Sequence, residues 1–108
     1  MKVEDTFPAM QKLFNPAAAA GLNKVIQLNI TGEDAGEHAI KISDQACQLV
    51  QPGEHKPDLT LTVSDKDWIA VTQGQLNPMN AFLSGKIKAT GDMMLAMKIP
   101  NLFPTQAS

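Results

Sequence analysis

Neither arginine nor tyrosine occurs in this sequence of 108 residues, and cysteine occurs only once. Arginine is the residue that binds phosphate, carboxylate and guanine with two hydrogen bonds at once, so its absence argues against recognition of nucleic acid. The nine basic residues, all lysines, do not balance the eleven carboxylates, and the net charge at neutral pH is -2. A slightly acidic domain of this kind is an unsuitable partner for nucleic acid, and we expect none.

The single cysteine, Cys47, excludes an intrachain disulfide, which is typical of a protein in a reducing compartment. No apolar run approaches the roughly 18 residues that a membrane-spanning helix needs. Residues 1–5 lack the basic and apolar parts of a secretory signal, and residues 106–108 do not form a peroxisomal address. The length is that of one domain. We therefore expect a single domain over residues 1–108, located in the cytoplasm.

Residues that could carry chemistry are few and scattered. His38 and His55 form no ligand-spaced cluster with Cys47, and Cys47 falls on the apolar phase of a strand, where a buried, inert thiol is expected. Sequence distance alone leaves a Cys–His dyad open. The carboxylates have simpler roles as helix caps or strand-entry residues, at Asp58, Asp65, Asp67 and Asp92. We expect no metal, no cofactor and no catalytic residue, which leaves a small isomerase or hydrolase as the least favoured function.

Hydrophobic periodicity divides the chain into short helices and strands. Helical spacing predicts a helix over residues 6–14 with Thr6 as its N-cap, and Asn15 and Pro16 start a second short helix that Gly21 ends. Strict alternation of apolar and polar residues predicts strands over residues 24–31, 40–43, 47–50, 59–64 and 86–90. Three further helices are predicted: one that Ser64 caps and Gly74 ends, one that Asn77 caps and Gly85 ends, and one over 93–99 that Asp92 caps and Pro100 ends.

The join between residues 43 and 46 is so short that its two strands must form an antiparallel hairpin. Its central residues, Asp44 and Gln45, lack the glycine that a two-residue turn prefers, which predicts a longer or strained turn. The order of elements indicates one α+β domain, with helices on one face of a mainly antiparallel sheet.

The last predicted helix is apolar nearly all round, since Lys98 is its only charged residue over 93–99. An ordinary surface helix has one polar side. This helix is therefore either the central element of the core or the wall of a cavity that a ligand fills. Four of the six methionines lie between Met79 and Met97, and methionine adapts its shape to varied partners. The pattern alone favours a methionine-rich core and leaves the pocket open.

Several ordered strings closely resemble the sterol carrier protein type 2 domain, a sterol- and lipid-transfer module that also occurs as small bacterial single-domain proteins. The likeness extends over essentially the whole chain, and the glycine- and lysine-rich third string is specific to it. The strings are Ser64-Asp65-Lys66-Asp67-Trp68, Gly74-Gln75-Leu76-Asn77-Pro78-Met79-Asn80-Ala81-Phe82, Ser84-Gly85-Lys86-Ile87-Lys88-Ala89-Thr90-Gly91-Asp92-Met93 and Leu95-Ala96-Met97-Lys98-Ile99.

The resemblance implies a five-stranded sheet in the order 3-2-1-4-5, with helices over one face and an apolar tunnel between the two layers. Members of the family bind fatty acids, fatty acyl-CoA, phospholipids or sterols. Some eukaryotic members carry a glutamine at the position of Met97, and the apolar side chain here favours a plain acyl chain. The implied ligand-binding residues, with Met79 added from the methionine-rich stretch, are Trp68, Val71, Met79, Phe82, Leu83, Met94, Leu95 and Met97, with Leu102 and Phe103 near the mouth.

The implied function is non-enzymatic binding and transfer of a lipid or another apolar small molecule. The alternative is a lipid-filled interaction module that regulates a partner enzyme of lipid metabolism. Transient contact with a membrane is a further hypothesis, because three lysines lie in the C-terminal part of the chain, at Lys86, Lys88 and Lys98. Lysines on the solvated side of an edge strand explain the first two, and the acidic residues Glu4 and Asp5 weaken a basic docking helix. The sequence favours this structural explanation.

Overall fold

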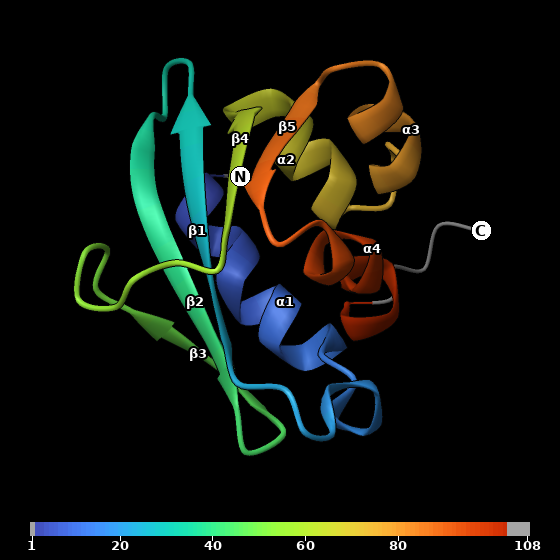
Figure 1. The fold of residues 1–108 in the computed structure, drawn as a ribbon. Coiled ribbons are helices and arrows are strands. Elements are labelled where there is room, and N and C mark those ends of the chain that lie inside the picture. The colour runs from blue at the N-terminus through green and yellow to red at the C-terminus, as the bar shows by residue number, and fades with distance from the viewer. Residues whose placement is uncertain (1, 104–108) are drawn as a thin grey trace.

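The computed structural model describes residues 2–103, which form a sheet covered by short helices (Figure 1). A 3₁₀ turn, η1, leads into the first α-helix, and a second 3₁₀ turn, η2, precedes the first strand. The elements in chain order are η1 (Val3–Asp5), α1 (Thr6–Leu13), η2 (Pro16–Ala19), β1 (Lys24–Thr31), β2 (Gly36–Ser43), β3 (Ala46–Val50), β4 (Leu59–Ser64), α2 (Asp65–Thr72), α3 (Pro78–Leu83), β5 (Ile87–Gly91) and α4 (Met93–Leu102).

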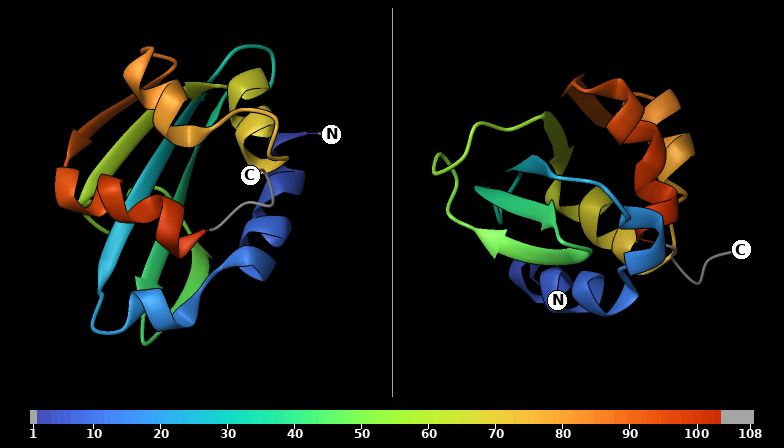
Figure 2. Two further views of the ribbon diagram at one scale, coloured as in Figure 1. Left: turned by 90° about the vertical axis from the view of Figure 1, so that its right-hand side faces the viewer. Right: turned by 60° about the horizontal axis from the view of Figure 1, so that its bottom comes forward.

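The sheet has the order β3-β2-β1-β4-β5, and its helices lie on one face (Figure 2). All pairs are antiparallel except β1 with β4, which run parallel. The apolar phase of β4, Leu59, Leu61 and Val63, is buried while the alternating residues are half-buried. The α+β class and the strand order are therefore confirmed. Within the described residues, no helix is long and apolar enough to cross a membrane.

The hairpin between β2 and β3 has the strained turn that its sequence predicts. Ser43 pairs directly with Ala46, which leaves a two-residue loop. Asp44 and Gln45 both adopt positive φ, at 53° and 58°, a left-handed region that residues other than glycine, asparagine and aspartate rarely adopt, so the strain falls on Gln45. The Gln45 amide also donates a hydrogen bond of 3.1 Å to the Pro16 carbonyl, which ties the turn to η2.

The predicted caps at Asn15, Ser64, Asn77 and Asp92 are confirmed, since each side chain accepts a hydrogen bond from a backbone N–H of the first helical turn. The predicted cap at Thr6 is wrong, because Thr6 is already helical and Asp5 occupies the N-cap position. Thr6 instead directs its hydroxyl inward, where it donates to the Val3 carbonyl. Threonine is a common N-cap residue, so its residue type alone did not distinguish a capping role for Thr6 from the buried role that the structure shows.

Two element boundaries differ from the predictions by more than one residue at sites with a clear cause. β2 begins at Gly36, earlier than expected, because its first residues complete the pairing with β1. Pro100 does not end the last helix: α4 continues to Leu102. Proline removes only one N–H, and the buried residues Leu102 and Phe103 anchor the final turn in the core despite that loss. The Phe103 N–H still donates to the Ile99 carbonyl over 2.9 Å.

Candidate functional site

A cavity of about 200 Å³ lies between the sheet and the three C-terminal helices. The strands β4 and β5 contribute one residue each, and α2, α3 and α4 supply the rest. The described lining residues are Leu61, Trp68, Val71, Pro78, Met79, Phe82, Ile87, Met93, Ala96, Met97, Ile99 and Pro100. Among them, Met79, Met93 and Met97 are also exposed, so the cavity opens to solvent between α3 and α4.

The lining side chains offer almost no hydrogen-bonding groups. Every described lining residue is apolar apart from the indole nitrogen of Trp68. That nitrogen donates to the Thr6 hydroxyl over 2.8 Å, and the hydroxyl donates in turn to the Val3 carbonyl over 2.6 Å. The polar atom of Trp68 is thus satisfied outside the cavity. The remaining wall can bind only by apolar contact and the hydrophobic effect.

Local sequence explains how the walls are positioned. Ser64 caps α2, so that Trp68 and Val71 come on one side of a helix that starts directly after β4. Asn77 accepts hydrogen bonds from the N–H groups of Met79 and Asn80, and Pro78 occupies the first helical position, which fixes the start of α3. The alternation of β5 directs Ile87 into the cavity and its neighbour Lys88 to the opposite face.

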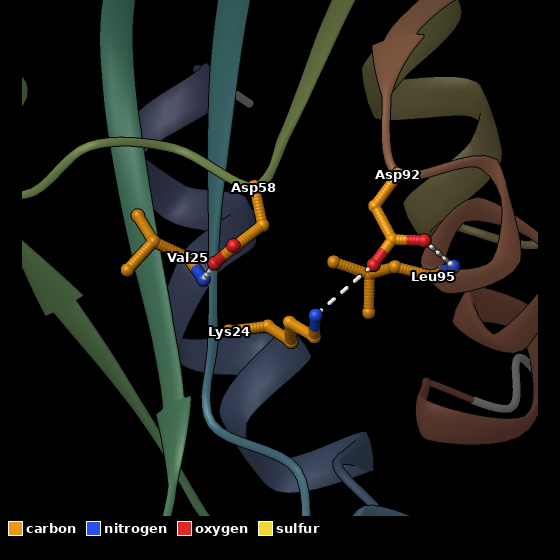
Figure 3. A network of polar contacts seen from close by, with 5 residues as sticks. All are labelled: Lys24, Val25, Asp58, Asp92 and Leu95. Atoms are coloured by element: carbon orange, nitrogen blue, oxygen red, sulfur yellow. Dashed lines mark hydrogen bonds and ion pairs between the residues drawn. The ribbon is translucent and has the colours of Figure 1, made fainter.

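A polar network fixes the start of α4 (Figure 3). The Asp92 carboxylate accepts from the Leu95 N–H over 3.1 Å and forms an ion pair with the Lys24 ammonium at 3.1 Å. The backbone bond to Leu95 and then Lys24 hold the pKa of the Asp92 carboxyl below its usual value. The Asp58 carboxylate accepts from the Val25 N–H over 2.8 Å, and the Asp58 carbonyl accepts from the Asp92 N–H over 2.8 Å.

The glycine before this cap is required by close packing. Gly91 has a φ of +109°, and a Cβ at this position would lie 2.5 Å from the Asp58 carbonyl oxygen. Only glycine therefore permits the Asp92–Asp58 backbone bond that connects β5 and α4 to the entrance of β4.

The structure divides the sequence-predicted site residues into two groups. Those in the cavity wall are Trp68, Val71, Met79, Phe82 and Met97. The others lie outside the wall: Leu83 and Met94 are 75% and 70% exposed, and Leu95 and Leu102 are buried in the core. Phe103 is also buried and packs on Phe14 with ring centroids 5.4 Å apart, rather than standing at the mouth. A binding role for all ten residues stays a prediction.

Other lining residues were missed: Leu61, Pro78, Ile87, Met93, Ala96, Ile99 and Pro100. Strand alternation predicts that the side chains of Leu61 and Ile87 point toward the core. Their place in one cavity wall follows only from the pairing of β4 with β5, which the sequence does not reveal. For α4 the difficulty is different. A helix without a polar side gives no sequence signal for which face meets the cavity, so Leu95 was chosen where Ala96 and Ile99 line it.

The residues with reactive side chains lie elsewhere. Cys47 lies on β3, in a shallow depression with Phe7, Met10 and Leu49, and burial raises the pKa of its thiol from 9.0 to about 11. His38 packs against Phe7 with ring centroids 4.8 Å apart. Neither histidine and none of the carboxylates occurs among the described lining residues.

The fold and the cavity define a class of small α+β lipid-binding domains. A sequence model described as the SCP-2 sterol transfer family matches residues 7–104, nearly the whole chain, and the chain belongs to this family. The family is generally a non-enzymatic lipid-binding fold, although some relatives are multidomain enzymes. Its members bind and transfer sterols and other lipids.

Relatives with known names support this assignment. The chain is 49% identical over 49 residues to human Sterol carrier protein 2, and 30% identical over 102 residues to Hydroxysteroid dehydrogenase-like protein 2 of Xenopus tropicalis. These matches cover 45% and 93% of this chain but only 9% and 24% of the relatives, so the chain spans a minor part of their length.

Solved structures show the same fold. Sterol carrier protein domain 2 of Helicoverpa armigera superposes with a TM-score of 0.73 at 30% identity, covering 94% of this chain and 87% of that one. Palmitated SCP2L2 of Aedes aegypti superposes with a TM-score of 0.72 at 24% identity, covering 96% of each chain. The second supports the fold alone.

Proposed function

We propose that this protein binds a lipid acyl chain in the cavity between the sheet and α2–α4, and carries it without chemical change. The observation that supports this most strongly is the wall itself, in which the described lining residues offer no free polar group, since the indole N–H of Trp68 is bonded to Thr6. A sterol hydroxyl or a charged headgroup would meet no polar partner there, whereas a hydrocarbon chain needs none. One structural neighbour, SCP2L2 of Aedes aegypti, was solved in a palmitated form, which fits an acyl chain as the ligand class.

The volume sets how much of the chain is enclosed. Sites that surround a whole drug-sized ligand have volumes of about 300–1,000 Å³, and this cavity has about 200 Å³. A long acyl chain would therefore place one segment inside and leave the remainder at the opening, unless α3 and α4 separate. Each buried methylene contributes about 0.8 kcal/mol, so an enclosed segment of about seven carbons would provide roughly 6 kcal/mol before the costs of association.

The test is a substitution that fills the cavity. Ala96 lines it and is half-buried, so Ala96→Phe should occupy the space of the ligand. The matched control is Ala9→Phe, the same change at an exposed position of α1 away from the cavity. We expect Ala96→Phe to weaken binding of palmitic acid by at least about tenfold, and the control to bind as the unchanged protein does.

The emission of Trp68 reports binding directly, because it is the only tryptophan, tyrosine is absent, and its ring faces the cavity. Unchanged emission on addition of palmitic acid, together with no lipid retained in native mass spectrometry, would reject the carrier function. Equal affinities of Ala96→Phe and Ala9→Phe would place the ligand elsewhere. A lipid that is retained but never exchanges with vesicles would favour the lipid-filled interaction module instead.

A further inference from the structure

The exposed large apolar side chains of the described residues are concentrated on two helices. Leu49 on β3 is one exception; all others lie on α3 or α4, at Met79, Leu83, Met93, Met94 and Met97. We refer to these five residues as the apolar rim. Met79, Met93 and Met97 belong to the cavity wall; Leu83 follows Met79 by four residues and Met94 precedes Met97 by three, about one helical turn in each case. The rim therefore surrounds the opening of the cavity.

The charged residues on α4 and in the turn after α3 are both lysines. Every carboxylate of the sequence precedes residue 68 except Asp92, and Asp92 is neutralised by its ion pair with Lys24. Lys98 follows Met94 by four residues on the exposed side of α4, and Lys86 is exposed just beyond the end of α3. The protein as a whole is acidic, whereas the charged side chains that α4 and the turn after α3 contribute are lysines.

We propose that the apolar rim is a docking surface for an anionic phospholipid bilayer, with Leu83 and Met94 inserting between the headgroups and Lys86 and Lys98 contacting lipid phosphates. This inference rests on the proposed function and names where the lipid enters. Apolar side chains beside lysines are typical of surfaces that rest on a membrane interface, where each lysine contributes about 1 kcal/mol. Lysine, unlike arginine, is a hydrated point charge that suits a diffuse anionic surface.

The position of the rim explains why a membrane is the favoured occupant. A lipid that left the cavity into water would expose each methylene at a cost of about 0.8 kcal/mol. If the opening rests on the bilayer, the chain passes from one apolar environment to another. A second copy of the protein would instead cover the opening, and its own Lys86 and Lys98 would meet like charges. The rim thus offers a path for the ligand only when a lipid surface covers it.

The experiment measures flotation with phosphatidylcholine vesicles that contain or lack phosphatidylserine. Leu83→Ser combined with Met94→Ser removes the two exposed side chains that do not line the cavity. The matched control is Leu49→Ser, which is 46% exposed on β3, the opposite edge of the sheet from β5. We expect the double variant to lose about tenfold or more in vesicle partitioning, and the control to lose none.

The lysines are tested separately. Lys86→Gln combined with Lys98→Gln should lower partitioning about tenfold on vesicles with phosphatidylserine, should not change it on phosphatidylcholine alone, and should abolish its dependence on salt. The reciprocal comparison is Lys88→Gln. Lys88 is an exposed residue within β5 that by strand alternation lies on the face away from the helices, whereas Lys86 belongs to the bend before the strand, so Lys88→Gln should have no effect.

Binding of cis-parinaric acid in solution separates this inference from the proposed function. The glutamine variants and Leu49→Ser should bind it as the unchanged protein does, and the Leu83/Met94 variant should lose far more in vesicle flotation than in parinaric acid binding. Vesicle flotation without any parinaric acid binding would reject the carrier function and retain the docking surface. Equal flotation of the Leu83/Met94 variant and Leu49→Ser would overturn the docking surface. A dimer in light scattering that Leu83→Ser with Met94→Ser makes monomeric would also overturn it, because a second copy would then occupy the rim.

Discussion

At the scale of single residues, Cys47 combines partial burial with a raised pKa. Its thiol packs near Phe7 and Met10 beneath β3, and loss of hydration raises the pKa from 9.0 to about 11. The folded protein therefore keeps a proton that the unfolded chain releases above pH 9. The stability that depends on this proton is fully present below pH 9 and is lost as the pH rises through about 11.

We therefore predict that Cys47→Ala reduces the loss of stability in alkali. The measurement is the urea midpoint of unfolding at about pH 8 and about pH 10.5, compared for the two proteins. The unchanged protein should lose more stability between these pH values than Cys47→Ala. The urea midpoints of the two proteins would decrease equally between the two pH values if desolvation of this thiol had no influence on stability. Alkylation by iodoacetamide at neutral pH should also be slow until urea unfolds the chain, because the thiolate is the reactive form.

At the scale of elements, the connection between β5 and α4 depends on Gly91. Two glycines with positive φ provide a matched pair: at Gly91 a Cβ would meet the Asp58 carbonyl, and at Gly85 it would meet nothing within 4 Å. Gly85→Ala should cost only the backbone strain, about 1–2 kcal/mol. Gly91→Ala should cost that strain plus the displacement of Asp58, a total of about 3 kcal/mol or more.

Chemical denaturation of the two variants checks this prediction. Because the Asp92 N–H bonds to the Asp58 carbonyl, Gly91→Ala should also displace the start of α4 and weaken binding of palmitic acid. Gly85→Ala should leave that affinity unchanged once the protein is folded. Equal losses of stability for the two glycines would show that the close approach to Asp58 relaxes without cost.

Sequence patterns predicted the elements far better than the faces they present. Alternation located each strand, and asparagine, serine or aspartate caps located the starts of α2, α3 and α4, because both signals are local. The cavity wall depends on contacts between distant residues. The hydrogen bond from Trp68 to Thr6 spans 62 residues, and no local pattern reveals it. The uniformly apolar α4 gives no sequence signal for its orientation, which is why the prediction put Leu95 in a wall where the structure has Ala96 and Ile99.

At the scale of the whole molecule, ligand binding should be linked to folding. The cavity is enclosed by two strands and three helices, so a ligand inside it binds the folded state and not the unfolded chain. Palmitic acid at about a hundred times its dissociation constant should add about 2.7 kcal/mol to the free energy of unfolding. For a domain of this size that corresponds to a rise in Tm of roughly 10 °C.

Calorimetry with increasing palmitic acid checks this linkage. The Tm of Ala96→Phe should rise little with increasing fatty acid, while the Tm of Ala9→Phe should rise as it does for the unchanged protein. A Tm that rises equally in both variants would mean that the fatty acid stabilises the protein from its surface rather than from the cavity.

The wall that lacks hydrogen-bonding groups also determines how sharply ligands can be distinguished. A polar site rejects an analogue without the matching group by several orders of magnitude, because buried partners are left unpaired. Here the Trp68 indole N–H already donates to the Thr6 hydroxyl, so no polar group in the cavity wall loses a hydrogen bond when one hydrocarbon replaces another. Each added or removed methylene changes the binding free energy by at most about 0.8 kcal/mol, or roughly fourfold in affinity. The protein would therefore rank its ligands along a shallow gradient of chain length, and the pool of lipids around it would decide which one it carries.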